Sequence, residues 1–495
     1  MKLLLSRVLL LALIVALTVP AGATAQTATP TATATPLPTD TPTPTATVAA
    51  TATATVPAPV PFVAYVPVVM KQLAGSNTGI QVQNTANSPA TVQVFYYNRM
   101  GQSSPTWTNT ATVAAGASET FYQGADPGLP IPFDGSAVVQ ATQSIRAIVN
   151  QTNYDRPTAS AGSFPAPSSS NVMQASLPAV FGGLGRDFTT IHIQNTGSAQ
   201  ATVTVSLFPS GSGAAVASIP VVIQPLTAER VRLAPGLGLP SNFAGTALVT
   251  SSNGTLVAAA ETLNEATGIM TSYAAFPQGA SVQNAPLLFK NFLGWVSSAH
   301  AMNVSGGTVT VNATLYHRDS ALSYPLPPRT LAPNEGYTWS LPALADLPDG
   351  VWSGVFSANG AIALVVQEIN ASRGTGMAYS GFSGGTPDIS IPLTFRDSNG
   401  WDTGIQVQNL GAIESIVTVE HYRTDTGSRV AVEAEAIPPG QSRTFYQPEN
   451  ANLAPGHVGS AVITSNNGQP IVAIVNEVNY LRGGDAAMAY EGVNY

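Results

Sequence analysis

The chain has no cysteine among its 495 residues, which excludes disulfide bonds, thiol nucleophiles and cysteine-ligated zinc. Charge is also scarce, because Asp, Glu, Lys and Arg make up 9% of the residues and the formal net charge is −8. A nucleic-acid-binding surface needs clustered Lys and Arg to displace counterions, so we expect no nucleic-acid partner. The Gly-rich motif with Lys and Ser or Thr that cradles phosphates is absent too, and we expect no cofactor.

Long apolar runs are rare, and one of them lies near the N-terminus. Lys2 and Arg7 precede a short apolar segment at 8–19, and Ala-Thr-Ala follows at 23–25. This order is typical of a cleaved secretory signal peptide, which we assign to residues 1–25. An uncleaved membrane anchor is the alternative, although the apolar run is short for a span of about 20 residues. We therefore expect a secreted or cell-surface protein with no stable membrane span in its mature form.

Residues 26–62 are almost entirely Thr, Pro and Ala, with Asp40 as the only charge. A segment with so few large apolar side chains cannot offset the entropy lost on ordering. Frequent Pro favours extended, polyproline-like geometry. We interpret this segment as a disordered linker or stalk whose threonines are candidates for O-glycosylation.

Three short landmarks recur four times each beyond the stalk. The heptapeptide TGIQVQN, for example, stands at both 78–84 and 403–409. The landmarks end at Asn84, Asn195, Asn303 and Asn409; at Met70, Phe181, Phe289 and Phe395; and at Asn153, Asn264, Asn370 and Asn479. Successive spacings are 111, 108 and 106 residues for the first two sets and 111, 106 and 109 for the third. One shared register indicates a fourfold repeat of a length suited to an independent domain.

The interior of each repeat predicts short strands, because apolar and polar residues alternate as in TVTVSLF at 202–208. Asn-Gly pairs at 253–254, 359–360 and 467–468 predict tight hairpins. We therefore predict an all-β fold with four tandem antiparallel immunoglobulin-like β-sandwich domains; a small barrel is the alternative for each domain. The predicted domains are repeat 1 at 63–166, repeat 2 at 175–278, repeat 3 at 283–384 and repeat 4 at 388–495. Short joins favour a rod with the domains in line.

The segment AYVPVVMK at 64–71 follows the stalk directly. It is similar to the start of the first domain in bacterial secreted and cell-surface proteins in which a Thr/Pro-rich stalk leads into tandem immunoglobulin-like domains. The chain resembles that group over nearly its whole length. The resemblance implies export and a surface or matrix role, and it assigns no activity.

Two repeated patterns supply candidate ligand-binding residues. In TGIQVQN the Ile and Val side chains can face the core, the Gln side chains can point outward, and the Asn can bond its own backbone at the strand end. In TFYQ the Phe can enter the core, which leaves the Tyr outside, where it can stack on a sugar or anchor a protein partner. The purely structural interpretation of both patterns stays open. The candidates are Gln81, Gln83, Gln406, Gln408, Tyr122 and Tyr446.

Reactive groups are not repeated with the scaffold. Ser383 lies in a G-x-S-x-G pattern at 381–385, but the nucleophile elbow requires a helix after it, and none is expected. Asp397, Asn399 and Asp402 hint at a calcium loop without the further ligands of an EF-hand. The histidines are isolated in sequence: His192, His300, His317, His421 and His457.

We assign no catalytic or metal-binding residue. The leading hypothesis is a non-enzymatic exported array for adhesion or envelope structure, with an extracellular protein or polysaccharide as partner. The alternatives are an array of carbohydrate-binding modules and a secreted serine hydrolase centred on Ser383.

Overall fold

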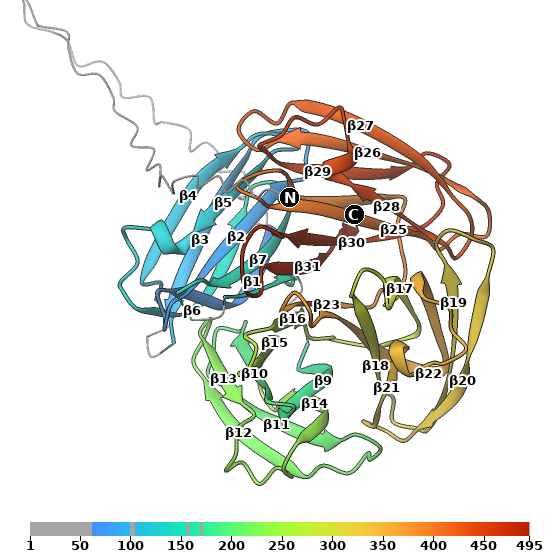
Figure 1. Cartoon of the computed structure of the whole chain (residues 1–495). Helices are drawn as coiled ribbons and strands as arrows, with labels where there is room; N and C mark the ends of the chain where they lie inside the picture. Colours follow the sequence, from blue (N-terminus) through green and yellow to red (C-terminus); the bar gives the residue numbers. More distant parts are fainter. Residues whose placement is uncertain (1–61, 100–103, 156–158, 169–171, 495) are drawn as a thin grey trace, which may run out of the picture. The chain divides into compact units, whose positions relative to one another are not determined.

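The computed structural model describes four stretches of the chain, residues 62–99, 104–155, 159–168 and 172–494 (Figure 1). The predicted signal peptide and all of the predicted stalk except Phe62 lie outside the described residues. Within the described part, the regular structure is β-strand apart from three one-turn 3-10 helices, which confirms the predicted all-β class. None of the helices in this part has the length and apolar character needed to cross a membrane.

The strands fall into four units that follow the fourfold repeat. The first unit holds β1 (Phe62–Lys71), β2 (Ser76–Asn84), β3 (Ala90–Asn98), β4 (Trp107–Val113), β5 (Ser118–Tyr122), η1 (Gln123–Ala125), β6 (Phe133–Ala141), β7 (Ile145–Asn153) and β8 (Ser160–Pro165). The second unit holds β9 (Gln174–Leu184), β10 (Asp187–Asn195), β11 (Ala201–Pro209), β12 (Ala217–Ile223), β13 (Ala228–Arg232), β14 (Phe243–Ser251), β15 (Leu256–Asn264) and β16 (Met270–Ala274).

The other two units repeat this order. The third unit holds β17 (Ala280–Lys290), β18 (Val296–Asn303), β19 (Val309–His317), β20 (Ser323–Leu331), β21 (Gly336–Ser340), η2 (Leu341–Ala343), β22 (Gly350–Asn370) and β23 (Thr375–Ser380). The fourth unit holds β24 (Asp388–Arg396), β25 (Asp402–Asn409), β26 (Ser415–Arg423), β27 (Arg429–Ile437), β28 (Ser442–Tyr446), η3 (Gln447–Glu449), β29 (His457–Ser465), β30 (Ile471–Val478), β31 (Ala487–Glu491) and β32 (Val493–Asn494). The residue boundaries of the predicted domains remain predictions.

Each unit consists of antiparallel strands in two layers. In the first unit, the strand orders are β1-β6-β3-β4 and β5-β2-β7-β8, and the fourth unit repeats this plan as β27-β26-β29-β24-β32 and β28-β25-β30-β31. In the second and third units the layers also join, because β9 pairs with both β14 and β10, and β22 runs through both layers. The antiparallel sandwich architecture predicted from the alternation is therefore confirmed.

A hydrophobic core lies between the two layers of each unit. In the first unit, Ile80 and Val82 of β2 are fully buried and share one core cluster with Val94 of β3 and Val149 of β7. Successive side chains of a strand point to opposite faces, so the alternating apolar residues all reach this inner space. The period of two read from the sequence thus places the core correctly.

The predicted tight hairpins at the Asn-Gly pairs are wrong. In the second unit, β14 pairs with β9 and β11, whereas β15 pairs with β10 and β16, so Asn253 and Gly254 join strands of different layers. The Asn253 Oδ1 atom accepts a hydrogen bond from the N–H of Thr202 at 2.8 Å, which fixes the crossing to the start of β11. The dipeptide at 253–254 marks a turn between layers, whereas the pair at 359–360 lies inside β22, which runs through both layers.

The predicted in-line rod is also wrong, because the units contact each other in a closed cycle. At every junction a Ser or Thr hydroxyl donates to a backbone carbonyl in the turn before the fifth strand of the next unit. The pairs are Ser136 with Leu226 at 2.8 Å, Thr246 with Asn334 at 2.7 Å, Ser353 with Gly440 at 2.8 Å and Ser460 with Gly116 at 3.0 Å. The last pair joins the fourth unit to the first. Short joins therefore bring neighbours side by side and close the cycle.

One short strand from each unit lies at the centre of this cycle, namely β8, β16, β23 and β31. β8 contacts β16, β16 contacts β23, β23 contacts β31, and β31 contacts β8. In Figure 1 the labels of β16, β23 and β31 accordingly lie close together in the middle of the four units. Gly162 of β8 allows a close approach, because a Cβ atom at this position would lie 2.6 Å from Ser272 Oγ of β16.

One carboxylate lies where the four central strands meet. Asp485 is fully buried; its Oδ2 accepts the N–H of Met270 at 2.6 Å and its Oδ1 accepts the N–H of Gly376 at 3.0 Å. The N–H groups of Ala161 and Ala487 also donate to it. These donors hold equivalent positions, so one side chain satisfies a backbone group from each unit. Burial raises the pKa of Asp485, and the N–H groups oppose that shift because they favour the charged form.

Candidate ligand-binding cavity

The four glutamines predicted to point outward are buried. Gln81 and Gln83 are 1% and 0% exposed, and Gln406 and Gln408 are 2% and 0% exposed. They do point away from the core of their own unit, as the alternation requires. The neighbouring unit covers that outer face, however, as the bond from Gln81 Nε2 to the carbonyl of Pro392 at 3.3 Å shows. At these four residues the structure therefore shows no amide row open to solvent, although Gln406 lines a cavity between two units.

Gln81 and Gln406 instead hold a repeated internal contact. Gln406 Nε2 donates to Ser442 Oγ at 2.6 Å, and the hydroxyl of Thr444 donates to Gln406 Oε1. Gln81 makes the matching bonds with Ser118 and Thr120. Each amide fixes the fifth strand against the second strand, so the pattern has a folding role in both units.

The predicted orientation of the TFYQ residues is confirmed. Phe121 and Phe445 are buried, at 7% and 2% exposed, whereas Tyr122 is 47% exposed. Tyr446 also leaves the core of its own unit, but it is half-buried because the third unit lies opposite. Burial raises the pKa of the Tyr446 hydroxyl, so this hydroxyl is neutral and can donate a hydrogen bond.

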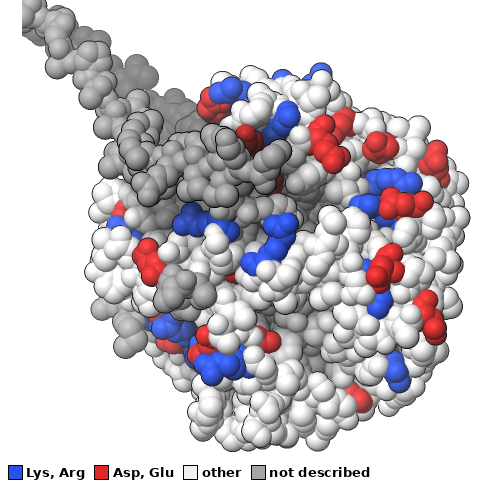
Figure 2. All heavy atoms as spheres, viewed as in Figure 1, with Lys and Arg blue, Asp and Glu red and all other residues white. Residues whose placement is uncertain are grey.

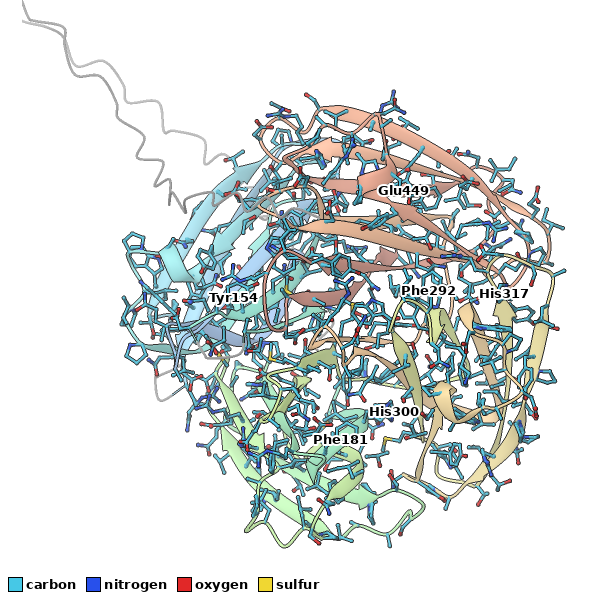
Figure 3. All side chains as sticks on the ribbon, viewed as in Figure 1. Tyr154, Phe181, Phe292, His300, His317 and Glu449 are labelled. Carbon is cyan, nitrogen blue, oxygen red and sulfur yellow. The ribbon has the colours of Figure 1, made fainter. Side chains whose placement is uncertain are left out.

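Tyr446 and Gln406 line a cavity of about 570 Å³ between the third and fourth units. This volume lies in the range of small-molecule binding sites. Aromatic and charged side chains from both units face it: Phe289, Phe292, Trp295, Tyr446, Tyr480, Arg318, Arg373, Arg443, Asp319 and Glu449. Figure 3 labels Phe292 from the third unit and Glu449 from the fourth, which lie on the two sides of the cavity.

Aromatic rings form the third-unit wall of the cavity. Phe289 stacks on Phe292 with ring centroids 6.1 Å apart and an interplanar angle of 4°, and Trp295 lies 5.9 Å from Phe289. Arg318 lies over the Phe292 ring at 5.5 Å, and Arg373 lies over the Tyr480 ring at 4.4 Å. Flat apolar faces thus adjoin guanidinium groups, as in sites that bind rings carrying polar substituents.

The arginines at the cavity have few anionic partners. Arg318 Nε and Nη2 donate to the two carboxylate oxygens of Asp319 at 2.9 and 3.0 Å, and this contact holds the pKa of Asp319 below its usual range. Arg443 donates to the backbone carbonyl of Arg318. In the part of the chain that the structure describes, neither Arg443 nor Arg373 forms an ion pair. Charged residues make up 9% of the chain and are scattered among uncharged residues on the face drawn in Figure 2.

The equivalent junction between the second and third units is nearly closed. Its cavity measures only about 20 Å³, lined by residues that include Phe181, His300 and Tyr337. His300 stands where the fourth unit has Gln406, and its ring lies edge-on to Phe181 with centroids 6.1 Å apart. Burial lowers the pKa of His300 to about 4, so the ring is neutral near pH 7. Both rings are labelled in Figure 3.

The weaker candidates from the sequence lie elsewhere. Ser383 is exposed in the connection between β23 and β24, and a strand follows it where a nucleophile elbow would need a helix. Asp397 and Asn399 have φ values of 45° and 52° in a tight turn, and the N–H of Asp397 donates to Asp402 Oδ1 at 2.8 Å. Gln72 and Asn77 make the matching bond in the first unit at 3.0 Å. The resemblance to a calcium loop therefore comes from a repeated turn.

Sequence reasoning found one side of the cavity and missed the other. Tyr446 and Gln406 were chosen from patterns within one repeat, whereas Phe292, Trp295 and Arg318 belong to the preceding repeat. A pattern within one repeat cannot show which faces of neighbouring units meet. The sequence does contain one signal for the cavity, which is a difference between the repeats. The residue before TFYQ is Arg443 in the fourth repeat and Glu119 in the first.

Comparisons with known proteins give no assignment. No protein-family model matches the sequence, and no curated protein matches it. A crystal structure of Thermotoga maritima 1070 is 19% identical with a TM-score of 0.19, over 21% of this chain and 93% of that one. A tetra-tandem repeat from the extending region of a large adhesion protein is 11% identical with a TM-score of 0.11, over 88% of this chain and 100% of that one. At these TM-scores neither likeness carries an argument.

Proposed function

We propose that the chain is an exported, non-enzymatic surface or matrix protein that binds an extracellular polysaccharide. Export rests on the predicted signal peptide at 1–25 and the predicted stalk at 26–62. Binding rests on one observation: the cavity of about 570 Å³ in which Tyr446 faces the aromatic residues of the third unit.

The lining of the cavity supports binding in preference to catalysis. Aromatic rings, guanidinium groups and amides can hold a sugar by stacking and hydrogen bonds. Ser383, the candidate nucleophile, is not among the residues that line the cavity. The amides of the repeat hold strands together, which supports a scaffold role for the repeated residues.

A glycan array probed with the mature chain tests this proposal. We expect saturable binding to at least one extracellular polysaccharide, and Tyr446→Ala should weaken it because one aromatic face is lost. Tyr122→Ala is the matched control, since Tyr122 holds the equivalent position in the first unit and lines no cavity described here. Binding that is unchanged in Tyr446→Ala, or absent from every glycan, would contradict the proposal.

A further inference from the structure

The charges at the first junction are balanced. Between the first and second units, Arg99 Nη2 lies 2.7 Å from Asp134 Oδ1, and Arg99 Nη1 lies 3.6 Å from Glu229 Oε2. Arg230 Nη2 lies 3.3 Å from Asp134 Oδ2. Each guanidinium group at this junction therefore faces a carboxylate of the same chain.

The junction between the third and fourth units, here the third junction, has an arginine in the place of Arg99 but no carboxylate in the places of Asp134 and Glu229. The N–H of Arg99 bonds the carbonyl of Asp134, and the N–H of Arg318 bonds the carbonyl of Val351, so Arg318 and Val351 hold the equivalent positions. Glu229 lies opposite Ile193 in β10, and the residue in the matching place of β28, opposite Val407 in β25, is Arg443. The sites of Asp134 and Glu229 are thus filled by an apolar and a cationic residue.

This exchange brings two guanidinium groups together where the first junction has an ion pair. Arg443 approaches Arg318 closely enough to donate to its backbone carbonyl, and both line the cavity. Like charges at close range are unfavourable unless an anion lies between or beside them. Asp319 forms an ion pair with Arg318, and the charge of Arg443 also lowers the pKa of Asp319, so two guanidinium groups share one carboxylate at this junction.

The cavity also holds an unused acceptor and exposed rings. Asn476 lines it, and the buried Oδ1 atom of Asn476 has no hydrogen-bond partner in the described structure. Glu449 is exposed at the edge and offers a second acceptor. Acceptors of this kind suit hydroxyl donors, and the rings of Phe292 and Tyr446 suit the flat face of a sugar.

We propose that this cavity binds an acidic sugar, namely a hexuronate unit of an extracellular polysaccharide. The carboxylate of the sugar lies against Arg443 and Arg373, its hydroxyls donate to Asn476 and Glu449, and its ring faces Phe292. The inference rests on the proposed function, since it names the class of polysaccharide that the same cavity takes. A guanidinium group that donates to a carboxylate forms a strong, charge-assisted contact, and this contact discriminates against neutral sugars.

Calorimetric titration of the mature chain tests the inference with three probes. They are oligogalacturonate, the same oligomer with its carboxylates methyl-esterified, and a neutral galacto-oligosaccharide of equal length. We expect oligogalacturonate to bind at least about tenfold more tightly than either uncharged probe. Arg443→Gln and the exposed Arg373→Gln should each weaken that binding by about tenfold. Arg423→Gln is the control, because Arg423 is exposed in the same unit and pairs with Asp425 away from the cavity.

Thermal unfolding of each variant shows whether the fold is retained, and Arg373→Gln changes an exposed side chain. Equal affinity for the charged and uncharged sugars overturns the inference and leaves the proposed function standing. Unchanged affinity in both arginine variants has the same consequence. Failure to bind any of the three probes, together with a blank glycan array, overturns both. Tighter binding of a poly-glutamate peptide than of oligogalacturonate overturns the assignment to a sugar.

Discussion

Asp485 shows how one residue can break the fourfold repeat to complete the fold. The equivalent positions in the other units hold Ala159, Gly268 and Gly374, which carry no polar side chain. The backbone donors that converge there would lack a partner without it, and a buried unsatisfied donor is costly.

Replacing this carboxylate should destabilise the protein strongly. Asp485→Ala leaves the N–H groups of Met270 and Gly376 unsatisfied in a buried site. We expect a loss of about 3 kcal/mol in the free energy of unfolding, measured by urea denaturation. Asp425→Ala, which removes an exposed carboxylate, should leave the free energy of unfolding almost unchanged. Equal effects of the two changes would show that Asp485 does not hold the centre.

The asparagine at the end of the second strand in each unit was interpreted correctly from the sequence. Asn84 Nδ2 donates to the carbonyls of Ser88, Val113 and Ala114 at 2.8 to 3.1 Å, and its Oδ1 accepts the N–H of Ala86 at 3.0 Å. The bonds to Ser88 and Ala86 are the local backbone bonding expected of Asn at a strand end, and those to Val113 and Ala114 join the loop to the end of β4. Local patterns predicted it because all its partners lie in the same unit.

Removal of one of these strand-end contacts gives a second prediction. Asn84→Ala should lower the free energy of unfolding by about 1 to 3 kcal/mol, because several buried carbonyls lose their donor. Asn87→Ala, three residues later in the exposed loop, should have almost no effect. Hydrogen exchange of the loop after β2 provides the measurement, with faster exchange expected in the first variant. Equal exchange rates in the two variants would remove the structural role assigned to Asn84.

The alternation along the strands predicts which side chains enter the core of a unit, but it does not predict which outer faces are covered by a neighbour. The alternation placed Ile80 and Phe121 in the core, because burial within one sandwich has a period of two. It placed Gln81 and Gln83 in solvent, where the structure has the neighbouring unit. Outward-facing residues alternate with core residues whether a neighbouring unit covers them or not. The alternation therefore cannot show which outer faces are buried. For the same reason, the cavity at the third junction could be predicted only from its fourth-unit side.

The centre of the four-unit body also holds buried glutamates that link stability to pH. Burial raises the pKa of Glu477 to about 8 and that of Glu491 to about 7, and it raises the pKa of Glu368 well above its usual range. Asn150 of the first unit donates to Glu477 of the fourth at 3.2 Å, and Asn476 of the fourth unit donates to Glu368 of the third at 3.1 Å. These contacts join different units, so the protonation of the glutamates affects the stability of the contacts between units.

The sign of the pH dependence follows from these raised pKa values. The folded chain keeps Glu477 protonated up to about pH 8, whereas the unfolded chain releases the proton near pH 4.5. The contribution to stability is therefore complete below about pH 4.5 and is lost as the pH rises to about 8. We expect urea denaturation to give a lower free energy of unfolding at pH 8 than at pH 5. Glu477→Gln should flatten this dependence, and an unchanged slope in the variant would contradict the assignment.

Closure of the cycle is the claim on which the cavity and the central carboxylates depend. Small-angle X-ray scattering of a chain starting at Pro59 measures it most directly, because this part forms one compact unit by its contacts. A closed four-unit body should give a radius of gyration of about 22 Å, as expected for a globular chain of this length. Four domains in line, about 140 Å long, would give about 40 Å, and a value near that figure would contradict the account.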